Sequence, residues 1–422
     1  MADKVLIVAP FWGMNAHPGY YRVDRFVRWL SKSGLKIVLL KAGNEDRVVE
    51  TPLGPEITIR DPLGLYPEVT QQSQESLSRR KPHRFRALAA QVLFNPDPSI
   101  LWARRAARHA FVSAHQEGVL WILSSSPPES AHIAAFILSK RWGKDLVVDL
   151  RDGWLDEPLK PLLRKFRLQQ WREGRLERRV FERARMIFVT SDIWKSLLHR
   201  RLPLTQGKTV VLTNGYPGEE FPRVAKDKKS SLRDRILLLH SGRFTGSSRS
   251  RKVNCLLEPL YHGLQGLNRR VSIKLLGHLD HEDVLEVGEW KPRLEARGCS
   301  IEVCAPVPRH EALNELCQSD GLLLLSMSEA AIPSKLFEYL STGLPILAVT
   351  PKKSAVWGIC ESLPQVYLVD YGSYQNDKLI VEEYFKACLS GGHQVEIPEQ
   401  YSEARLSKIF LEETGRLQSS SR

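Results

Sequence analysis

Short apolar runs alternate with amphipathic segments along the whole chain, a pattern typical of parallel sheets joined by crossover helices. In the first half the apolar runs predict strands at Val5–Ala9, Lys36–Leu40, Val119–Leu123, Leu146–Leu150, Met186–Thr190 and Thr209–Thr213. In the second half they predict strands at Ile236–His240, Val271–Gly277, Ile301–Ala305, Gly321–Leu325, Ile346–Val349 and Val366–Asp370. The sequence therefore predicts an α/β fold with two doubly wound parallel sheets.

Helical spacing and breaks in composition predict the domain limits. The residues that recur at helical spacing after the first strand are Val23, Phe26, Val27 and Leu30, and Gly34 ends that helix. The polar, proline-containing stretch 221–232 predicts a hinge between domains at 1–222 and 232–395. The last helical stretch, Ser402–Leu417, predicts a terminal helix at about 400–418 that follows the second domain.

Charge is distributed unevenly between the two halves of the 422 residues. Residues 1–222 hold 35 Lys and Arg against 23 Asp and Glu, a net charge of +12, whereas residues 223–422 hold 26 against 25. The basic clusters are Arg79–Lys81 with Arg84 and Arg86, Arg104 with Arg105 and Arg108, and the run 164–185, interleaved with Phe85, Trp102, Phe166 and Trp171. A basic lobe favours a polyanionic partner, either nucleic acid or an anionic membrane, with a solvated surface as the alternative.

The cysteines and the chain start give expectations about location. The six cysteines lie in the second half without metal-ligand or redox spacing, so we expect reduced packing residues. The first residues run directly into a buried strand, and no long apolar span follows. We therefore expect a cytoplasmic protein.

The segment 332–339 carries the clearest candidate chemistry. A strand at Gly321–Leu325 precedes it, a helix opens near Pro333, and Gly343 ends that helix. This places a helix N-terminus at the carboxyl edge of a parallel sheet, where nucleotides bind. Lys335 can neutralise a phosphate, and Glu338 on the same helical face can accept hydrogen bonds from a ribose diol. The segment predicts a nucleoside diphosphate site formed by Pro333, Ser334, Lys335, Leu336 and Glu338, with a solvated Lys and Glu on a Rossmann helix as the alternative.

A second candidate phosphate contact follows the strand 236–240. Gly242 and Arg243 lie in a glycine-bearing loop, and Arg249 and Arg251 come shortly after them. We expect Arg243 to contact a diphosphate, with the two later arginines or a merely exposed basic turn as alternatives.

Two segments of the first half place polar residues at predicted strand ends. Ser126 and Glu129 have capping-box spacing with Pro127 at the first helical position, and His132 lies one turn further. The next strand ends in Asp149–Trp154, which places Arg151 and Asp152 at the sheet edge and Trp154 where it can stack on a sugar. A structural histidine and an Arg–Asp pair that closes the sheet edge are the alternatives.

The loop after the first strand contains Gly19 and Arg22. Gly19 permits a tight turn, and Arg22 at the helix start can meet an anionic ligand. The loop is not a GxGxxG fingerprint, which disfavours nicotinamide and flavin binding. A plain structural turn is equally compatible with these residues.

The segment 332–339 resembles the C-terminal signature of the retaining GT-B glycosyltransferases, glycosyltransferase family 4. That family carries two glutamates eight positions apart; Glu338 matches the second, whereas Ala330 occupies the first position and Glu329 is the nearest acid. Ser126–His132 and Asp149–Trp154 also resemble segments of one branch of these enzymes, with Gly153 in place of a proline.

The resemblance implies two Rossmann-like domains with a cleft between them and a C-terminal helix that crosses back. It implies transfer of a hexosyl group from a nucleoside diphosphate sugar to a hydroxyl acceptor with retention, without a metal or cofactor. In that reading Arg243 and Lys335 stabilise the leaving diphosphate with Gly242 beside them, and His132 and Asp152 orient the acceptor or the sugar. The residues expected to bind the acceptor are Gly19, Arg22, Ser126, Glu129, Arg151 and Trp154.

The expected acceptor is a glycan or a lipid-linked molecule at the inner face of a membrane, in cell-surface glycan or polysaccharide biosynthesis. A nucleotide-sugar epimerase of the same architecture and a non-catalytic basic binding protein remain alternatives. No RNA-binding motif accompanies the basic residues, so nucleic acid is not the expected partner.

Overall fold

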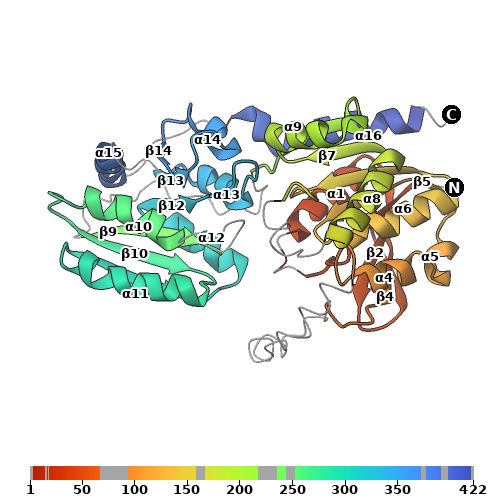
Figure 1. Cartoon of the computed structure of the whole chain (residues 1–422), viewed down its shortest axis with the longest axis horizontal. Helices are drawn as coiled ribbons and strands as arrows, with labels where there is room; N and C mark the ends of the chain where they lie inside the picture. Colours follow the sequence, from red (N-terminus) through yellow and green to blue (C-terminus); the bar gives the residue numbers. More distant parts are fainter. Residues whose placement is uncertain are drawn as a thin grey trace. The chain divides into compact units, whose positions relative to one another are not determined.

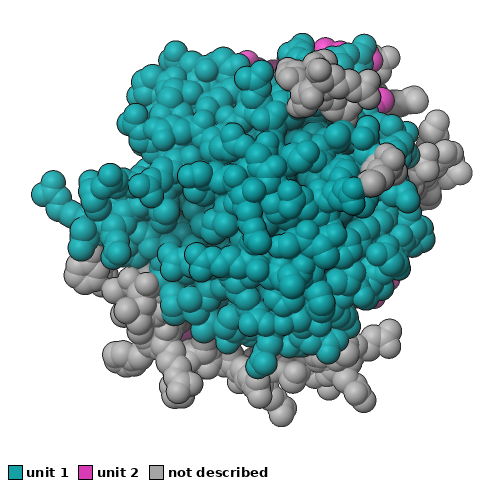
Figure 2. Space-filling model, turned by 90° about the vertical axis from the view of Figure 1, so that its right-hand side faces the viewer, with its two compact units in different colours: residues 1–212, 407–422 teal, residues 213–406 magenta. Residues whose placement is uncertain are grey.

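The computed structural model describes residues 3–14, 17, 19–66, 94–157, 167–216, 235–243, 252–371, 377–390 and 398–419. The chain divides into two compact units, each built on its own sheet (Figure 1). Unit 1 comprises Met1–Leu212 and Ser407–Arg422, and unit 2 comprises Thr213–Leu406. Figure 2 shows the surface of unit 1 in teal. The predicted hinge at 221–232 lies outside the described residues.

Unit 1 contains a sheet of eight strands in the order β3-β4-β2-β1-β5-β6-β7-β8. The strands are β1 (Lys4–Val8), β2 (Lys36–Gly43), β3 (Arg47–Thr51), β4 (Gly54–Arg60), β5 (Val119–Ser126), β6 (Asp145–Leu150), β7 (Ala184–Val189) and β8 (Thr209–Val211). All neighbours pair in parallel except β3 and β4. All of the strands predicted for this half are present.

The hairpin of β3 and β4 is an addition that the sequence did not predict. Charged residues and a proline interrupt the apolar pattern of both strands. Only one side of β4 is strongly apolar, with Ile57 and Ile59 fully buried. Because β4 pairs in parallel with β2, the hairpin extends the predicted sheet without changing its class.

The helices of unit 1 follow the expected crossover pattern (Figure 1). They are α1 (Tyr20–Lys32), α4 (Ile100–Ala106), α5 (Ala110–Ala114), α6 (Ser130–Trp142), α8 (Arg167–Arg183), α9 (Asp192–Arg201) and the short 3-10 helix η2 (Pro203–Thr205). The predicted apolar stripe of α1 is buried, which confirms the face on which that helix packs.

Unit 2 contains a fully parallel sheet of six strands in the order β11-β10-β9-β12-β13-β14. The strands are β9 (Arg235–Ser241), β10 (Arg270–Leu276), β11 (Cys299–Cys304), β12 (Gly321–Leu325), β13 (Ile346–Thr350) and β14 (Val366–Asp370). Consecutive residues of β9, Leu238 and Leu239, belong to different hydrophobic clusters. Both faces of the sheet are therefore covered, as a doubly wound fold requires.

The helices of unit 2 pack on both faces of this sheet. They are α10 (Lys252–Gly263), α11 (His281–Glu295), α12 (Arg309–Gln318), α13 (Ser334–Thr342), α14 (Ala355–Cys360), α15 (Asp377–Ser390) and the short η5 (Glu399–Tyr401). The predicted helix at Pro333 is confirmed as α13, with Pro333 as its N-cap residue and the left-handed Gly343, at φ 68°, as its C-cap.

The terminal helix α16 (Glu403–Ser419) returns to unit 1, as the resemblance implied. The ring of Phe410 stacks on Phe26 of α1 at a centroid distance of 4.7 Å, and it also contacts Phe188 of β7. The first and last parts of the sequence thus share one core.

All six cysteines are free thiols, and four of them are buried. The four buried thiols, Cys255, Cys299, Cys360 and Cys388, belong to the hydrophobic clusters of unit 2, which confirms a packing role for these four. Over the described residues, no helix combines the length and the apolar character that a membrane span needs.

Candidate functional site

The two sheets each have a switch point where the chain changes the direction in which it adds strands. In unit 2 this point lies between β9 and β12, and in unit 1 between β1 and β5. Ligands of doubly wound folds bind at the carboxyl end of such strand pairs.

At the edge of the unit 2 sheet, Lys335 of α13 reaches the end of β9. Its Nζ donates to the carbonyl oxygen of Arg243 at 3.2 Å and lies 3.3 Å from Nε2 of His240. Gly242 adopts φ +94°, and a side chain there would begin 3.3 Å from Nζ. The structure therefore brings together the predicted residues Gly242, Arg243 and Lys335.

His240 is a buried residue of β9 whose role sequence reasoning missed. Its Nδ1 lies 2.8 Å from the carbonyl oxygen of Leu323 in β12, and because a carbonyl only accepts, Nδ1 carries the hydrogen. Burial, with a smaller contribution from Lys335, keeps the pKa of His240 well below its usual value. The ring is thus neutral, and Nε2 accepts a hydrogen bond from Lys335.

The ammonium group of Lys335 has two neutral hydrogen-bond partners, an imidazole and a carbonyl. Burial lowers the pKa of Lys335 to about 8, although the nearby charge of Glu338 opposes this shift. An anion at this position would restore the stability of the charged form. The site is therefore suited to a phosphate group.

Glu338 lies one turn further along α13 and forms an ion pair with Arg309 at the start of α12. The distance from Nη2 to Oε1 is 2.8 Å, and both side chains are partly exposed. The hydroxyl of Tyr339 accepts a hydrogen bond from the backbone N–H of Ser241 at 2.8 Å, which fixes α13 against β9. Arg309 and Tyr339 are additions to the predicted site, while the ribose contact of Glu338 stays a prediction.

The remaining predicted donor residues have different environments. Leu336 is fully buried in the core, so its side chain cannot contact a ligand, whereas Ser334 is exposed. Glu329 is exposed and Ala330 is buried, so the two positions are not equivalent. The alternatives Arg249 and Arg251 lie outside the described residues.

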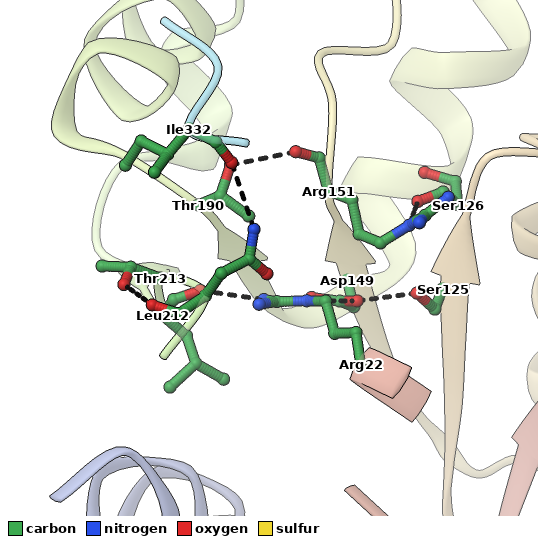
Figure 3. Close-up of polar contacts among 10 residues, drawn as sticks. Arg22, Ser125, Ser126, Asp149, Arg151, Thr190, Leu212, Thr213 and Ile332 are labelled. Atoms are coloured by element: carbon green, nitrogen blue, oxygen red, sulfur yellow. Dashed lines mark hydrogen bonds and ion pairs between the residues drawn. The ribbon is translucent and has the colours of Figure 1, made fainter. Parts of the chain in front are cut away.

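At the edge of the unit 1 sheet, Arg22 and Asp149 form a buried ion pair (Figure 3). The guanidinium donates from Nη2 to Oδ1 at 2.7 Å and from Nε to Oδ2 at 3.0 Å. Nη2 also donates to the carbonyl oxygen of Leu212, and the Ser125 hydroxyl donates to Asp149. This edge therefore matches the alternative interpretation of the sequence, in which an Arg–Asp pair closes the sheet edge. The arginine of the pair is Arg22.

Arg151 lies against two other predicted acceptor residues, Ser126 and Gly19. Its Nε donates to the carbonyl oxygen of Ser126 at 2.9 Å, and its guanidinium lies over the ring of Phe11. A side chain on Gly19 would begin 2.9 Å from the guanidinium carbon and 2.8 Å from the Phe11 ring. The glycine is thus required for this close approach, whereas the sequence attributed it to a tight turn. Burial lowers the pKa of Arg151, and the charge of the half-buried Asp152 opposes that shift.

The predicted capping box of Ser126 and Glu129 is wrong. Strand β5 continues through Ser126, which pairs with Leu150, and α6 begins only at Ser130. Asp97 caps the helix instead, because its Oδ2 accepts a hydrogen bond from the Ser130 N–H at 2.8 Å. Pro127 therefore lies before the helix and not at its first position.

Asp97 was not assigned any chemistry from the sequence, although it lies between two prolines. Burial and the neighbouring carboxylate of Glu129 raise its pKa to about 6. Its Oδ1 also accepts from the Ser99 N–H at 2.9 Å. Glu129 is buried beside it and belongs to this structural cluster.

His132 and Trp154 lie in the core of unit 1, with exposed fractions of 0% and 1%. His132 Nδ1 lies 2.8 Å from the Ser124 hydroxyl, and the Trp154 indole donates to Glu173 at 2.8 Å. The two rings pack at a centroid distance of 5.7 Å. The expectation that Trp154 stacks on a sugar is wrong for this structure, because neither ring face is exposed.

In the described ranges of the chain, no group of three or more His, Cys, Asp or Glu residues is placed so that it could hold a metal ion.

No protein-family model and no curated protein matches the sequence. Solved structures match over nearly the whole chain. Sucrose-phosphate synthase from Thermosynechococcus elongatus has a TM-score of 0.63 at 13% identity and covers 99% of this chain and 100% of its own. Trehalose 6-phosphate synthase from Burkholderia multivorans has a TM-score of 0.60 at 10% identity and covers 100% of both chains. HepE of Anabaena, in complex with UDP and glucose, has a TM-score of 0.58 at 14% identity and covers 98% of this chain and 100% of its own.

Proposed function

We propose that this chain, which has the GT-B fold, is a glycosyltransferase that moves a sugar from a nucleoside diphosphate sugar to a hydroxyl acceptor. The similar solved structures are themselves synthases of sugar phosphates or bind UDP and glucose. Because their sequence identity to this chain is low, these structures show only the fold. The proposed activity therefore depends on the residues of this chain.

The observation that carries the proposal is the environment of Lys335. Its ammonium lies at the switch point of the unit 2 sheet and is held by His240 and the Arg243 carbonyl, both neutral. A diphosphate at this position would receive the charge of Lys335 and the dipole of α13. Such groups stabilise the charge that develops on a leaving phosphate by about 3 kcal/mol for one well-placed donor.

Glu338 is proposed to bind the ribose. Arg309 fixes one carboxylate oxygen at 2.8 Å, which orients the group without removing its capacity to accept further hydrogen bonds. The complexes of HepE with UDP and with UDP-glucose make UDP-glucose the first donor to test.

On unit 1, Arg151 and Asp152 are proposed to orient the acceptor. Arg151 is fixed by Ser126 and Phe11, and Asp152 is only half-buried. His132 and Trp154 are left out of this role because their rings are buried. We propose retention by same-face attack, in which the departing phosphate takes the acceptor proton, so that no protein nucleophile, metal or cofactor is needed.

The acceptor is proposed to be a glycan or lipid-linked molecule used in polysaccharide biosynthesis. The net charge of +12 on residues 1–222 supports a contact between unit 1 and an anionic membrane surface. A cytoplasmic protein bound peripherally to the inner face of the membrane fits this charge distribution.

Thermal unfolding with UDP-, GDP-, dTDP- and ADP-glucose tests the proposal. A donor at 100 times its dissociation constant adds about 2.7 kcal/mol of stability. At the same donor concentration, Lys335→Gln should reduce this stabilisation to between about 0.4 and 1.4 kcal/mol while leaving the melting temperature of the free protein nearly unchanged. No shift with any sugar nucleotide would overturn the proposal, and interconversion of sugar nucleotides without an acceptor would identify an epimerase instead.

A further inference from the structure

Helix α8 presents an unusual exposed face. Its first turns expose the large apolar side chains Leu168 and Trp171, which are 64% and 57% accessible. The exposed arginines of the same helix are Arg167, Arg172, Arg175, Arg178 and Arg179. Leu168, Trp171, Arg172, Arg175 and Arg179 follow helical spacing, so they form one continuous stripe, here called the α8 arginine face.

The acidic residues of α8 do not neutralise this face. Glu173 and Glu177 are fully buried on the opposite side. Glu173 accepts from the Trp154 indole, and Glu177 accepts from Arg201 at 2.8 Å. The one exposed acid of the helix, Glu182, pairs with Arg178 at 2.8 Å. The α8 arginine face therefore keeps a strong positive charge.

Trp171 is held within this charged surface. The guanidinium of Arg175 lies 4.7 Å from its ring centroid, while the ring remains more than half exposed. The cation–π contact limits the rotamers of both side chains. An apolar ring surrounded by arginines matches the interfacial layer of a bilayer, where indole rings sit at headgroup level and guanidinium groups meet phosphates.

The basic cluster at α4 gives a useful contrast. Its aromatic residue, Trp102, is fully buried and donates to the Ile59 carbonyl, so it belongs to the core. Arg105 of that helix is paired with Asp46. Near that cluster, within the described residues, the large apolar side chain that is exposed is Phe111 of α5, at 39%, whereas α8 combines two that are more than half exposed with its arginines.

We propose that the α8 arginine face docks unit 1 on an anionic phospholipid bilayer, with the arginines on headgroup phosphates and Leu168 and Trp171 in the interfacial layer. Charge complementarity favours an anionic bilayer as the partner of this face, because a neutral protein partner would leave the arginines unpaired. A single exposed ring on a helix is also a poor stacking platform for bases, which disfavours nucleic acid. The inference assigns a surface to the membrane contact proposed above, and it does not depend on the nucleotide site.

Co-sedimentation of the full chain with vesicles tests this assignment. The vesicles contain equal parts of phosphatidylglycerol and phosphatidylcholine, with pure phosphatidylcholine vesicles as the uncharged comparison, in low-salt buffer. Arg172→Glu with Arg175→Glu should weaken binding at least 25-fold, since each arginine near an anionic surface contributes about fivefold. Leu168→Ala with Trp171→Ala should weaken binding roughly tenfold while leaving its salt dependence unchanged.

Matched variants test whether vesicle binding depends on the α8 arginine face itself or only on the overall charge and hydrophobicity of the protein. Lys291→Glu with Lys386→Glu makes the same charge change on exposed positions of unit 2, and Leu379→Ala removes an apolar side chain that is 68% exposed there. Both controls should bind vesicles within about twofold of the native chain if only the α8 arginine face docks. Each variant is used only if its melting temperature equals that of the native chain, so that a loss of binding is not caused by unfolding.

Equal loss in the α8 and control charge variants would overturn the assignment, as would binding to uncharged vesicles with the same affinity. Tighter binding to a single-stranded oligonucleotide than to anionic vesicles would replace the membrane with nucleic acid. Vesicle binding in a protein that shows no thermal shift with sugar nucleotides would support the docking surface and reject the proposed function.

Discussion

The carboxyl edges of the two sheets occupy equivalent places in the fold but differ in how their charges are satisfied. In unit 1 the cation of Arg22 meets the carboxylate of Asp149 in a fully buried pair. In unit 2 the cation of Lys335 meets a neutral imidazole and a carbonyl. The first arrangement is complete within the protein, whereas the second favours an added anion. The same position in two similar sheets is thus closed by an ion pair in unit 1, whereas in unit 2 it is the proposed binding site.

The largest expected effect is the loss of the unit 1 pair. Asp149→Ala leaves Arg22 buried without its carboxylate and should lower the free energy of unfolding by about 3–5 kcal/mol, measured by urea denaturation. Ser125→Ala removes one hydrogen bond to the same carboxylate and should cost about 1 kcal/mol. If both variants lose the same amount, the pair does not dominate the stability of this edge.

Lys335→Gln should have a small effect on stability and a large effect on ligand binding. Its partners are neutral, so the free energy of unfolding should change by less than about 1 kcal/mol. Calorimetry should show that its affinities for UDP and for pyrophosphate fall by about 10- to 100-fold, because a charged hydrogen bond to the phosphate is lost. Lys353→Gln, at an exposed lysine of the same unit, is the control that should bind as tightly as the native chain.

Glu338→Gln distinguishes the contribution of the ribose contact to binding from that of the diphosphate contact. It should weaken UDP binding by about tenfold, because one charged acceptor is lost, and leave pyrophosphate binding unchanged. A similar loss for both ligands would mean that Glu338 acts through Lys335 or Arg309 and not on the ribose.

The pH dependence of UDP binding gives the smallest effect. A ligand phosphate favours the protonated form of Lys335, whose pKa in the free protein is about 8, so affinity should fall as pH rises above 7. The expected decrease between pH 7 and 8.5 is about fourfold. His240 stays neutral over this range because its pKa is well below its usual value. A flat profile for the native chain, or an unchanged slope in Lys335→Gln, would contradict the assignment.

The strand pattern and the helix at Pro333 could be predicted because buried parallel strands and a helix stop at Gly343 leave strong local signals. The hairpin of β3 and β4 could not, because its strands are only partly buried and carry polar residues. Helix starts depend on tertiary contacts as well. The cap of α6 comes from Asp97, far from Ser130 in the sequence, which local spacing cannot reveal.

The candidate site shows the same limit. Lys335 and Arg243 could be placed at one sheet edge from strand order alone, since both follow predicted strands. The burial of His132 and Trp154 could not, because a histidine and a tryptophan are compatible with both core and ligand contacts. His240 could not be identified from the sequence for a related reason. Its capacity to accept a hydrogen bond from Lys335 depends on the carbonyl of Leu323 in another strand, which fixes the tautomer of the ring.

The return of α16 to unit 1 has a consequence for the biosynthesis of the protein. Phe410 packs against Phe26 and Phe188, yet the ribosome adds it only after the whole of unit 2 has been synthesised. The rings of Phe26, Trp29 and Phe188 therefore lack their Phe410 contacts until translation is nearly finished. Any fragment that ends near Leu212 would leave these rings without α16 and should aggregate unless α16 is supplied in trans or fused to it.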